Sequence, residues 1–186
     1  MKPIGILKCK LEKNQRYVLC PLKENQLWRP FYASGFGTLQ NDLLQLTIYE
    51  ALYLLRTNRI LLLDKDGKKL SFDDILNILR GEDYFIYLAY QEIRNRGFTL
   101  RSDFLEDIPF FKIYKRGALI TNQEPFAYIY VTLSLKAIKM SDLSKLLEKA
   151  SNDGKKLLIV VIDELGDLTT YEVSQVLLKE TKLKVR

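Results

Sequence analysis

The sequence predicts an α+β N-terminal domain, residues 1–80, followed by an α/β C-terminal domain with a mixed sheet, residues 82–186. Three observations lead to this expectation. Short runs of alternating polar and apolar residues fill the first part before helical patterns begin. The second part has the order helix, three strands, helix, two strands, which is typical of layered α/β folds. Its predicted strand at 155–163 contains a continuous apolar run, as in strands that are covered on both faces.

The composition is that of a globular protein. The chain has 186 residues, of which 47% are apolar and 28% charged, enough for one ordinary domain or two small ones. No apolar run approaches the roughly 20 residues of a membrane helix, and the N-terminus lacks the apolar segment of a secretion signal. We therefore expect a cytoplasmic protein. The net charge of +6 is compatible with a nucleic-acid partner but does not indicate one by itself.

Two alternating runs, 4–11 and 16–22, predict a β-hairpin at the N-terminus. In the expected register Cys9 faces Val18, so that Cys9 and Cys20 share a face but lie diagonally, about 7–8 Å apart. That separation is too long for a disulfide. We therefore expect two free, half-buried cysteines. With two cysteines and no histidine, the composition also argues against a zinc site.

Two capping boxes mark the helices of the N-terminal domain. Thr47 and Glu50 open the first helix, and residues 71–74 open a second that Gly81 ends. Residues 60–70 between them predict a strand, a tight turn and a short strand. The segment 28–40 is too aromatic and too poor in glycine for a phosphate loop, and we expect a packed turn there.

The C-terminal elements follow from the same signals. A helix at 84–96 is ended by Gly97, and Ser141 caps a second helix. The expected strands are 98–102, 110–115, 127–136, 155–163 and 168–176.

In this order, four stretches resemble motifs of the archaeal tRNA-splicing endonuclease family. They are EALYLLRTNRI, YQEIRNRGFTLRS, FFKIYKRGA and GKKLLIVVIDELGDLTTYEV, which together span about residues 47–174. The resemblance implies a tRNA-endonuclease or restriction-endonuclease-like fold. It also implies metal-independent cleavage of precursor tRNA without a cofactor. In the family a tyrosine deprotonates the ribose 2′-OH, a histidine protonates the leaving 5′-oxygen and a lysine stabilises the charged phosphorane.

The resemblance places Tyr114 and Lys155 at the tyrosine and lysine positions. The histidine position is held by Glu124 and Pro125, and the chain has no histidine at all. Proline transfers no proton, and a solvated glutamate is ionised near pH 7. Glu148 stands where catalytic members carry an arginine. The resemblance therefore implies a vestigial pocket in a structural subunit, which pairs with a catalytic sister chain in a heterotetramer.

An acidic turn is the expected docking element. The resemblance implies that Asp163, Glu164 and Asp167 insert into a basic cleft of a neighbouring subunit, where opposite charges fix register and speed association. The alternative is an ordinary solvated turn. Val173 and Val176 lie near an edge that a partner strand can pair with.

Basic residues of the C-terminal domain are candidates for contact with RNA phosphates, which add affinity but no sequence reading. They are Arg94, Arg96, Arg101, Lys112, Lys115 and Arg116. The alternative is a solvated basic face.

Three other functions are compatible with the sequence. One is a self-sufficient RNA endonuclease that uses Tyr114 and Lys155 alone. Another is a magnesium-dependent nuclease built on one of the triplets 66–68, 153–155 or 180–182. The third is an RNA-binding module with no enzymatic partner.

Overall fold

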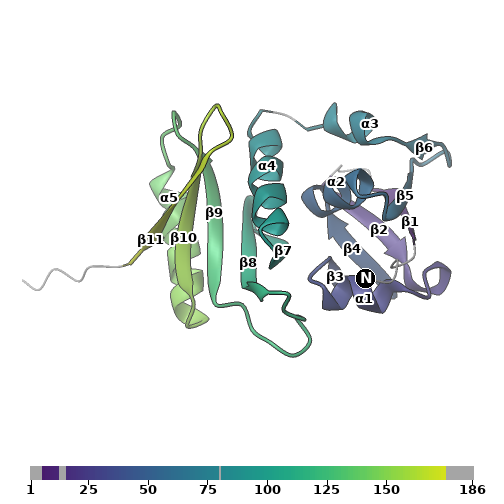
Figure 1. Ribbon diagram of the computed structural model, residues 1–186, viewed down its shortest axis with the longest axis horizontal. Coiled ribbons are helices and arrows are strands. Elements are labelled where there is room, and N and C mark those ends of the chain that lie inside the picture. Colours follow the sequence, from purple (N-terminus) through teal and green to yellow (C-terminus); the bar gives the residue numbers. More distant parts are fainter. Residues whose placement is uncertain (1–5, 13–15, 80, 175–186) are drawn as a thin grey trace, which may run out of the picture.

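The computed structural model describes residues 6–12, 16–79 and 81–174. It contains two mixed sheets with few helices (Figure 1). The strand order is β3-β4-β2-β1-β5-β6 in the first sheet and β11-β10-β9-β8-β7 in the second. Each sheet has one parallel pair, β1 with β5 and β9 with β10. The predicted α+β class with a mixed second sheet is therefore confirmed, whereas the division into domains at residues 1–80 and 82–186 stays a prediction.

The first sheet and its helices come from residues 7–76. The elements are β1 Leu7–Leu11, β2 Tyr17–Pro21, the 3-10 helix η1 Leu22–Glu24, α1 Trp28–Ala33, β3 Thr38–Gln40, β4 Leu43–Thr47, α2 Ile48–Arg56, β5 Ile60–Leu63, β6 Lys69–Leu70 and α3 Phe72–Leu76. Both predicted capping boxes are present, at Thr47 with Glu50 and at Ser71 with Asp74. Helix α3 is shorter than predicted, and Gly81 caps the start of the next helix instead of ending this one.

The prediction of a packed turn at 28–40 is wrong. The segment forms helix α1 and then strand β3, which pairs with β4. The two strands are joined at Asn41 and Asp42, whose φ angles are 44° and 60°. Asparagine and aspartate tolerate such angles better than other residues. Asn41 and Asp42 are therefore the feature of the sequence that indicates a hairpin of β3 and β4.

The prediction of free cysteines is also wrong. Cys9 and Cys20 form a disulfide, and their Cα atoms are 4.2 Å apart. The register of β1 and β2 places Lys10 opposite Leu19 and Leu11 opposite Val18, so the two cysteines face each other directly. The expected register differed by two residues. A two-residue shift keeps every side chain on its face, so the alternation of polar and apolar residues is the same in both registers.

The second sheet and its helices come from residues 82–173. The elements are α4 Glu82–Asn95, β7 Phe98–Leu105, β8 Ile108–Arg116, β9 Ala127–Leu133, α5 Met140–Asn152, β10 Lys156–Ile162 and β11 Leu168–Val173. The order of helix, three strands, helix and two strands is confirmed. The capping role of Ser141 is wrong, because α5 begins one residue earlier with Lys139 at its N-cap and without a side-chain cap. Among the described residues, no helix combines the length and apolar character needed to cross a membrane.

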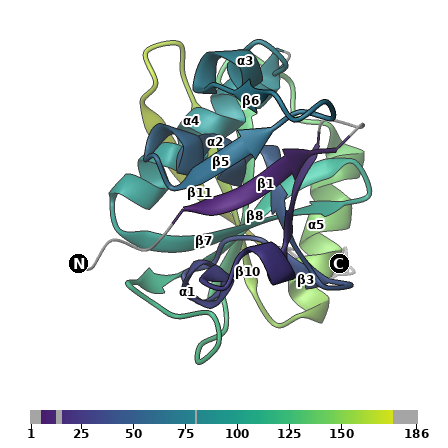
Figure 2. The same cartoon turned by 90° about the vertical axis from the view of Figure 1, so that its right-hand side faces the viewer.

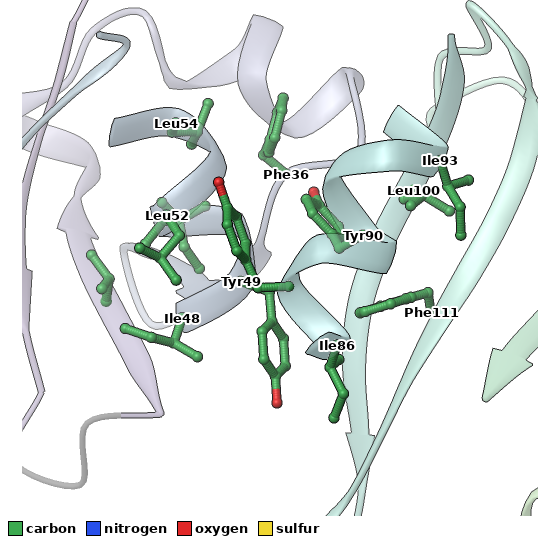
Figure 3. Packing of buried hydrophobic residues seen from close by; sticks show 14 of the residues in the cluster. Phe36, Ile48, Tyr49, Leu52, Leu54, Ile86, Tyr90, Ile93, Leu100 and Phe111 are labelled. Atoms are coloured by element: carbon green, nitrogen blue, oxygen red, sulfur yellow. The ribbon is translucent and has the colours of Figure 1, made fainter. Parts of the chain in front are cut away.

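Helix α4 lies between the two sheets and packs on α2, so that one hydrophobic core runs through both (Figures 1 and 3). Tyr90 of α4 packs against Phe111 of β8, with ring centroids 5.2 Å apart, and Tyr49 of α2 lies 6.1 Å from the same ring. On the other face of the second sheet, Leu146 and Ala150 of α5 cover a separate cluster. The sheet is thus covered on both faces, as its apolar strands indicate.

The loop that follows α1 touches β7 closely at Gly35. A Cβ atom at this position lies 2.7 Å from the carbonyl oxygen of Leu100 and 2.8 Å from Cγ2 of Thr99, and the φ angle is +84°. Gly67 has nearly the same φ of +83° but open space around its Cα. A comparison of the same substitution at Gly35 and at Gly67 therefore separates the effect of backbone strain from that of steric overlap.

We expect Gly67→Ala to lower the free energy of unfolding by about 1 kcal/mol, because an alanine at positive φ is strained. Gly35→Ala should lower it by about 3 kcal/mol or more, since overlap with the backbone of β7 adds to the strain. Urea unfolding of both variants measures the difference. Equal losses would show that the contact between Gly35 and β7 does not constrain the fold.

Candidate functional site

Tyr114 and Lys155 lie at the same end of the second sheet and on the same face. Ile113 pairs with Ala127, and Lys156 pairs with the same Ala127 from the other side. One residue along, Tyr114, Phe126 and Lys155 therefore form a row across three neighbouring strands. Residues in such a row point to one face, and strands are about 4.8 Å apart, so the two backbones are separated by about 10 Å.

The row points to the face that α5 covers. Side chains alternate along β8, and Phe111 belongs to the core shared with α4 whereas Phe110 packs with α5. Tyr114 has the parity of Phe110. It is 4% exposed, and burial raises its pKa, although the positive charge of Arg101 opposes the shift. Tyr114 is thus a neutral phenol near pH 7.

The ammonium group of Lys155 donates a hydrogen bond to the carboxylate of Glu124, with Nζ and Oε2 2.5 Å apart. The lysine side chain is 17% exposed and that of Glu124 is 83% exposed. The hydrogen bond and charge of Lys155 lower the pKa of Glu124. Glu124 is therefore an ionised carboxylate that neutralises Lys155, and it has no proton to donate at neutral pH.

The row therefore contains a phenol and a cation but no acid that titrates near pH 7. A phenol can accept a proton from a hydroxyl only after it has lost its own. A lysine that is already paired with a carboxylate gives less stabilisation to a developing negative charge. The residues that stand at this end of the sheet are suited to contact with a phosphodiester but poorly suited to breaking it.

The predicted RNA-contact residues are dispersed, and five of the six have a defined neighbour. Arg94 donates four of its five N–H groups within the protein, to the Tyr90 hydroxyl and to the carbonyls of Ser34, Gly35 and Leu100. This guanidinium joins α4 to the loop after α1. The sequence did not reveal this structural role, because the carbonyl groups of Ser34 and Gly35 lie about 60 residues away.

The other cations differ in their pairing. Arg96 pairs with Glu92 on α4, and Lys112 pairs with Asp103 across β7 and β8 with Nζ and Oδ2 2.6 Å apart. Lys115 is exposed. Arg116 and Arg101 lie over aromatic rings, those of Phe98 and Tyr32.

The acidic turn joins β10 to β11. The carboxylate of Asp163 accepts hydrogen bonds from the backbone N–H groups of Leu165 and Asp167, so it shapes the turn from inside. Glu164 and Asp167 are exposed. Leu165 at the tip of the turn is 89% exposed. It is not among the interface residues predicted from the sequence, although it stands between acidic residues.

Strand β11 forms one edge of the second sheet and pairs only with β10 among the described strands. Val173 is half-buried against the cluster beneath α5. Val176 lies outside the described residues, so its predicted role is not addressed by the structure.

Two of the three triplets of the magnesium alternative have other structural roles. Residues 66–68 belong to a turn that the carboxylate of Asp64 caps. The carboxylate of Asp153 accepts hydrogen bonds from the Tyr128 hydroxyl and from Lys149, and residues 180–182 lie outside the described part. Within the described ranges, no group of three or more acidic, cysteine or histidine side chains is arranged to hold a metal ion. Glu148 is exposed on α5 and lines a groove of about 350 Å³ with Glu106 and Lys145.

Sequence comparisons show which proteins this chain is similar to. Residues 19–76 match the pattern of the tRNA intron endonuclease N-terminal domain. A tRNA-splicing endonuclease of Pyrococcus horikoshii is 30% identical over 142 residues, which cover 75% of this chain and 80% of that protein. One of Methanothermobacter thermautotrophicus is 31% identical over 142 residues, covering 75% and 82%. One of Methanococcoides burtonii is 30% identical over 162 residues, or 85% of this chain, but the match spans only 45% of that protein.

Two mixed sheets, with a tyrosine and a lysine in one row at the end of the second, define an α+β protein of endonuclease-like fold. The chain belongs to the tRNA-splicing endonuclease family.

Proposed function

We propose that this chain is the structural subunit of a tRNA-intron splicing endonuclease. Two copies of this chain assemble with two copies of a catalytic sister chain. In this complex they position the sister chain on precursor tRNA at bulge–helix–bulge sites. Cleavage by the sister chain is metal-independent and leaves a 2′,3′-cyclic phosphate and a 5′-hydroxyl. The names of the matching proteins support the splicing role.

One observation carries the division of labour between the two chains. At the end of the sheet where Tyr114 and Lys155 share a face, the position of the proton donor is held by Glu124, which is ionised and bound to Lys155. Proton transfer by a positioned side chain contributes about 10²–10⁴-fold to a rate. A site without that contribution needs a partner that supplies it.

Co-expression with a histidine-bearing sister chain tests the proposal. We expect the purified complex to contain both chains and to cleave precursor tRNA, whereas this chain alone should cleave it at least about 100-fold more slowly. Tyr114→Phe in this chain should leave cleavage by the complex nearly unchanged. If cleavage and assembly do not depend on this chain, the proposal is wrong.

A self-sufficient endonuclease is the second candidate, and the shared face of Tyr114 and Lys155 favours it. In that case the purified chain cleaves precursor tRNA alone, at the rate of the complex, and Tyr114→Phe abolishes the activity. The same two preparations therefore separate the candidates.

The acidic turn is the proposed contact with the sister chain. We expect Glu164→Gln combined with Asp167→Asn to weaken assembly about tenfold at low salt, because loss of opposite charges slows association. Both residues are exposed and leave the turn intact, whereas Asp163→Asn also disturbs the backbone hydrogen bonds.

The matched control is Asp66→Asn with Glu148→Gln, which removes the same charge from two exposed positions elsewhere. Analytical ultracentrifugation at several salt concentrations measures the assembly. Equal behaviour of the two double variants would remove the turn from the interface.

A further inference from the structure

Arg101 is the one half-buried cation on its side of β7 and β8 that has no carboxylate partner within the described residues. Lys112 is paired with Asp103, and Lys155 with Glu124. The Nε atom of Arg101 is buried and has no hydrogen-bond partner in the described part of the chain. Buried donors are nearly always satisfied in proteins, so this guanidinium is suited to an anion from outside the chain.

Two aromatic side chains of helix α1 lie next to each other beside Arg101. The guanidinium carbon lies 5.5 Å from the ring centroid of Tyr32 in α1. The ring of Tyr32 lies 6.2 Å from that of Trp28, and the exposed Arg29 lies 5.7 Å over the Trp28 ring. We call these four residues, Arg29, Trp28, Tyr32 and Arg101, the α1 strip.

The α1 strip begins beside the row of Tyr114 and Lys155. Arg101 acts on the phenol of Tyr114 through its charge and through a side-chain hydrogen bond, and the hydroxyl of Tyr32 acts on the same phenol. The loop between β8 and β9, which carries Glu124, also runs beside α1 (Figures 1 and 2). There the N–H of Ile120 donates to the carbonyl of Ala33. The α1 strip therefore extends from the end of the sheet that carries Tyr114 and Lys155 onto α1.

Two half-buried aromatic rings with a guanidinium group at either end match one class of ligand in particular. Unpaired nucleotides offer base faces that stack on aromatic rings and phosphates that bind arginine. Bases of a duplex are already stacked on one another and are not available in this way. We propose that the α1 strip binds unpaired RNA nucleotides, with a phosphate on Arg101 and a base on the rings of Tyr32 and Trp28.

Binding of a fluorescent single-stranded oligouridylate of about ten nucleotides to the full chain tests the proposal by anisotropy. We expect Arg101→Met and Tyr32→Leu each to raise the Kd about tenfold, since loss of one stacked base has about that effect. Tyr32→Phe keeps the ring and should stay within about twofold of the natural chain. Trp28→Leu, at the outer end of the strip, should raise the Kd without disturbing Arg101.

Arg56→Met is the control, because Arg56 also lies over an aromatic ring, that of Phe72, but is exposed. Its Kd should change less than about threefold, as expected for one surface charge. The proposal is overturned if the natural chain does not bind the oligonucleotide or if Arg56→Met loses as much affinity as Arg101→Met. It is equally overturned if the same strand in a duplex binds as tightly, or if both Tyr32→Leu and Trp28→Leu bind unchanged.

This inference rests on the proposed role in RNA splicing, but the two fail separately. Assembly and intron cleavage by the co-expressed chains measure the splicing role. Binding of short RNA by this chain alone measures the α1 strip.

Discussion

A histidine in place of Glu124 is expected to raise cleavage of precursor tRNA at this chain's own site by at least about 100-fold. In the proposed function Glu124 takes the position of the proton donor, and its carboxylate neutralises Lys155 at 2.5 Å. Glu124→His supplies an acid whose ordinary pKa is about 6.5 and also releases the ammonium group of Lys155. Both effects favour departure of the 5′-oxygen and stabilisation of the charged phosphorane.

The assay is cleavage by the complex with a sister chain whose own catalytic histidine has been replaced, so that only this chain's site contributes. Glu124→Gln is the control, because it releases Lys155 without adding an acid, and it should give little or no gain. Addition of Tyr114→Phe to Glu124→His should abolish the gain. The gain should fade above about pH 7 as the imidazolium loses its proton.

If Glu124→Gln and Glu124→His give the same gain, the ion pair rather than the missing acid limits the site. If neither gives a gain while the fold is intact, the shared face of Tyr114 and Lys155 does not form a working geometry.

Replacing Glu50 by leucine is expected to lower the free energy of unfolding at pH 7 by about 3 kcal/mol or more. The Glu50 carboxylate is fully buried and accepts backbone N–H groups from Gly37, Thr47 and Ser102. These three donors belong to the loop after α1, the start of α2 and β7. Leucine fills the same space but accepts nothing, so all three donors lose their partner.

Each unsatisfied buried donor costs about 1–3 kcal/mol, and loss of the buried charge returns part of that cost. Glu148→Leu is the matched control, since Glu148 is exposed on α5 and the same change there should stay within about 0.5 kcal/mol. Similar losses at both positions would contradict the role of Glu50 in joining the two sheets.

The same carboxylate makes stability depend on pH. Burial raises the pKa of Glu50 to about 6, against the opposing hydrogen bonds of Thr47 and Ser102. Because the folded-state pKa lies above the unfolded value of 4.5, the contribution of the protonated form is complete below pH 4.5 and is lost as the pH rises through about 6. The loss across this window is about 2 kcal/mol.

Glu50→Gln removes this titration while it keeps the shape of the side chain. The difference in unfolding free energy between the natural chain and Glu50→Gln should therefore change by about 2 kcal/mol between pH 4.5 and 7, with the natural chain losing stability as the pH rises. A constant difference across this range would show that the carboxylate does not titrate there.

Predictions from sequence were correct where the interaction is local. The capping boxes at Thr47 and Ser71 join residues three positions apart, and Gly97 follows helix α4 with a φ of 89° that suits glycine. Such features depend on a few neighbouring residues and hardly on the rest of the fold. Ser141 shows the limit, because a helix can begin one residue before a good cap.

Predictions failed where a long-range contact selects among local alternatives. The two-residue error in the first hairpin arose because both registers bury the same side chains. The register is fixed by neighbours in space: β1 pairs with β5, and β2 pairs with β4. The side chain of Asn25 also holds both the N–H and the carbonyl of Lys8.

The sequence by itself determined that the chain has no histidine and that two of its helices begin at capping boxes. It also supplied the resemblance on which the proposed roles of Tyr114 and Lys155 rest. Composition follows directly from the sequence, and short-range hydrogen bonds depend only on neighbouring residues. Only the tertiary structure decided that Cys9 meets Cys20, that Glu124 neutralises Lys155, and that Arg101 lies on Tyr32 without a carboxylate partner in the described chain. These contacts join residues far apart in the sequence, and their formation depends on how whole strands and helices pack.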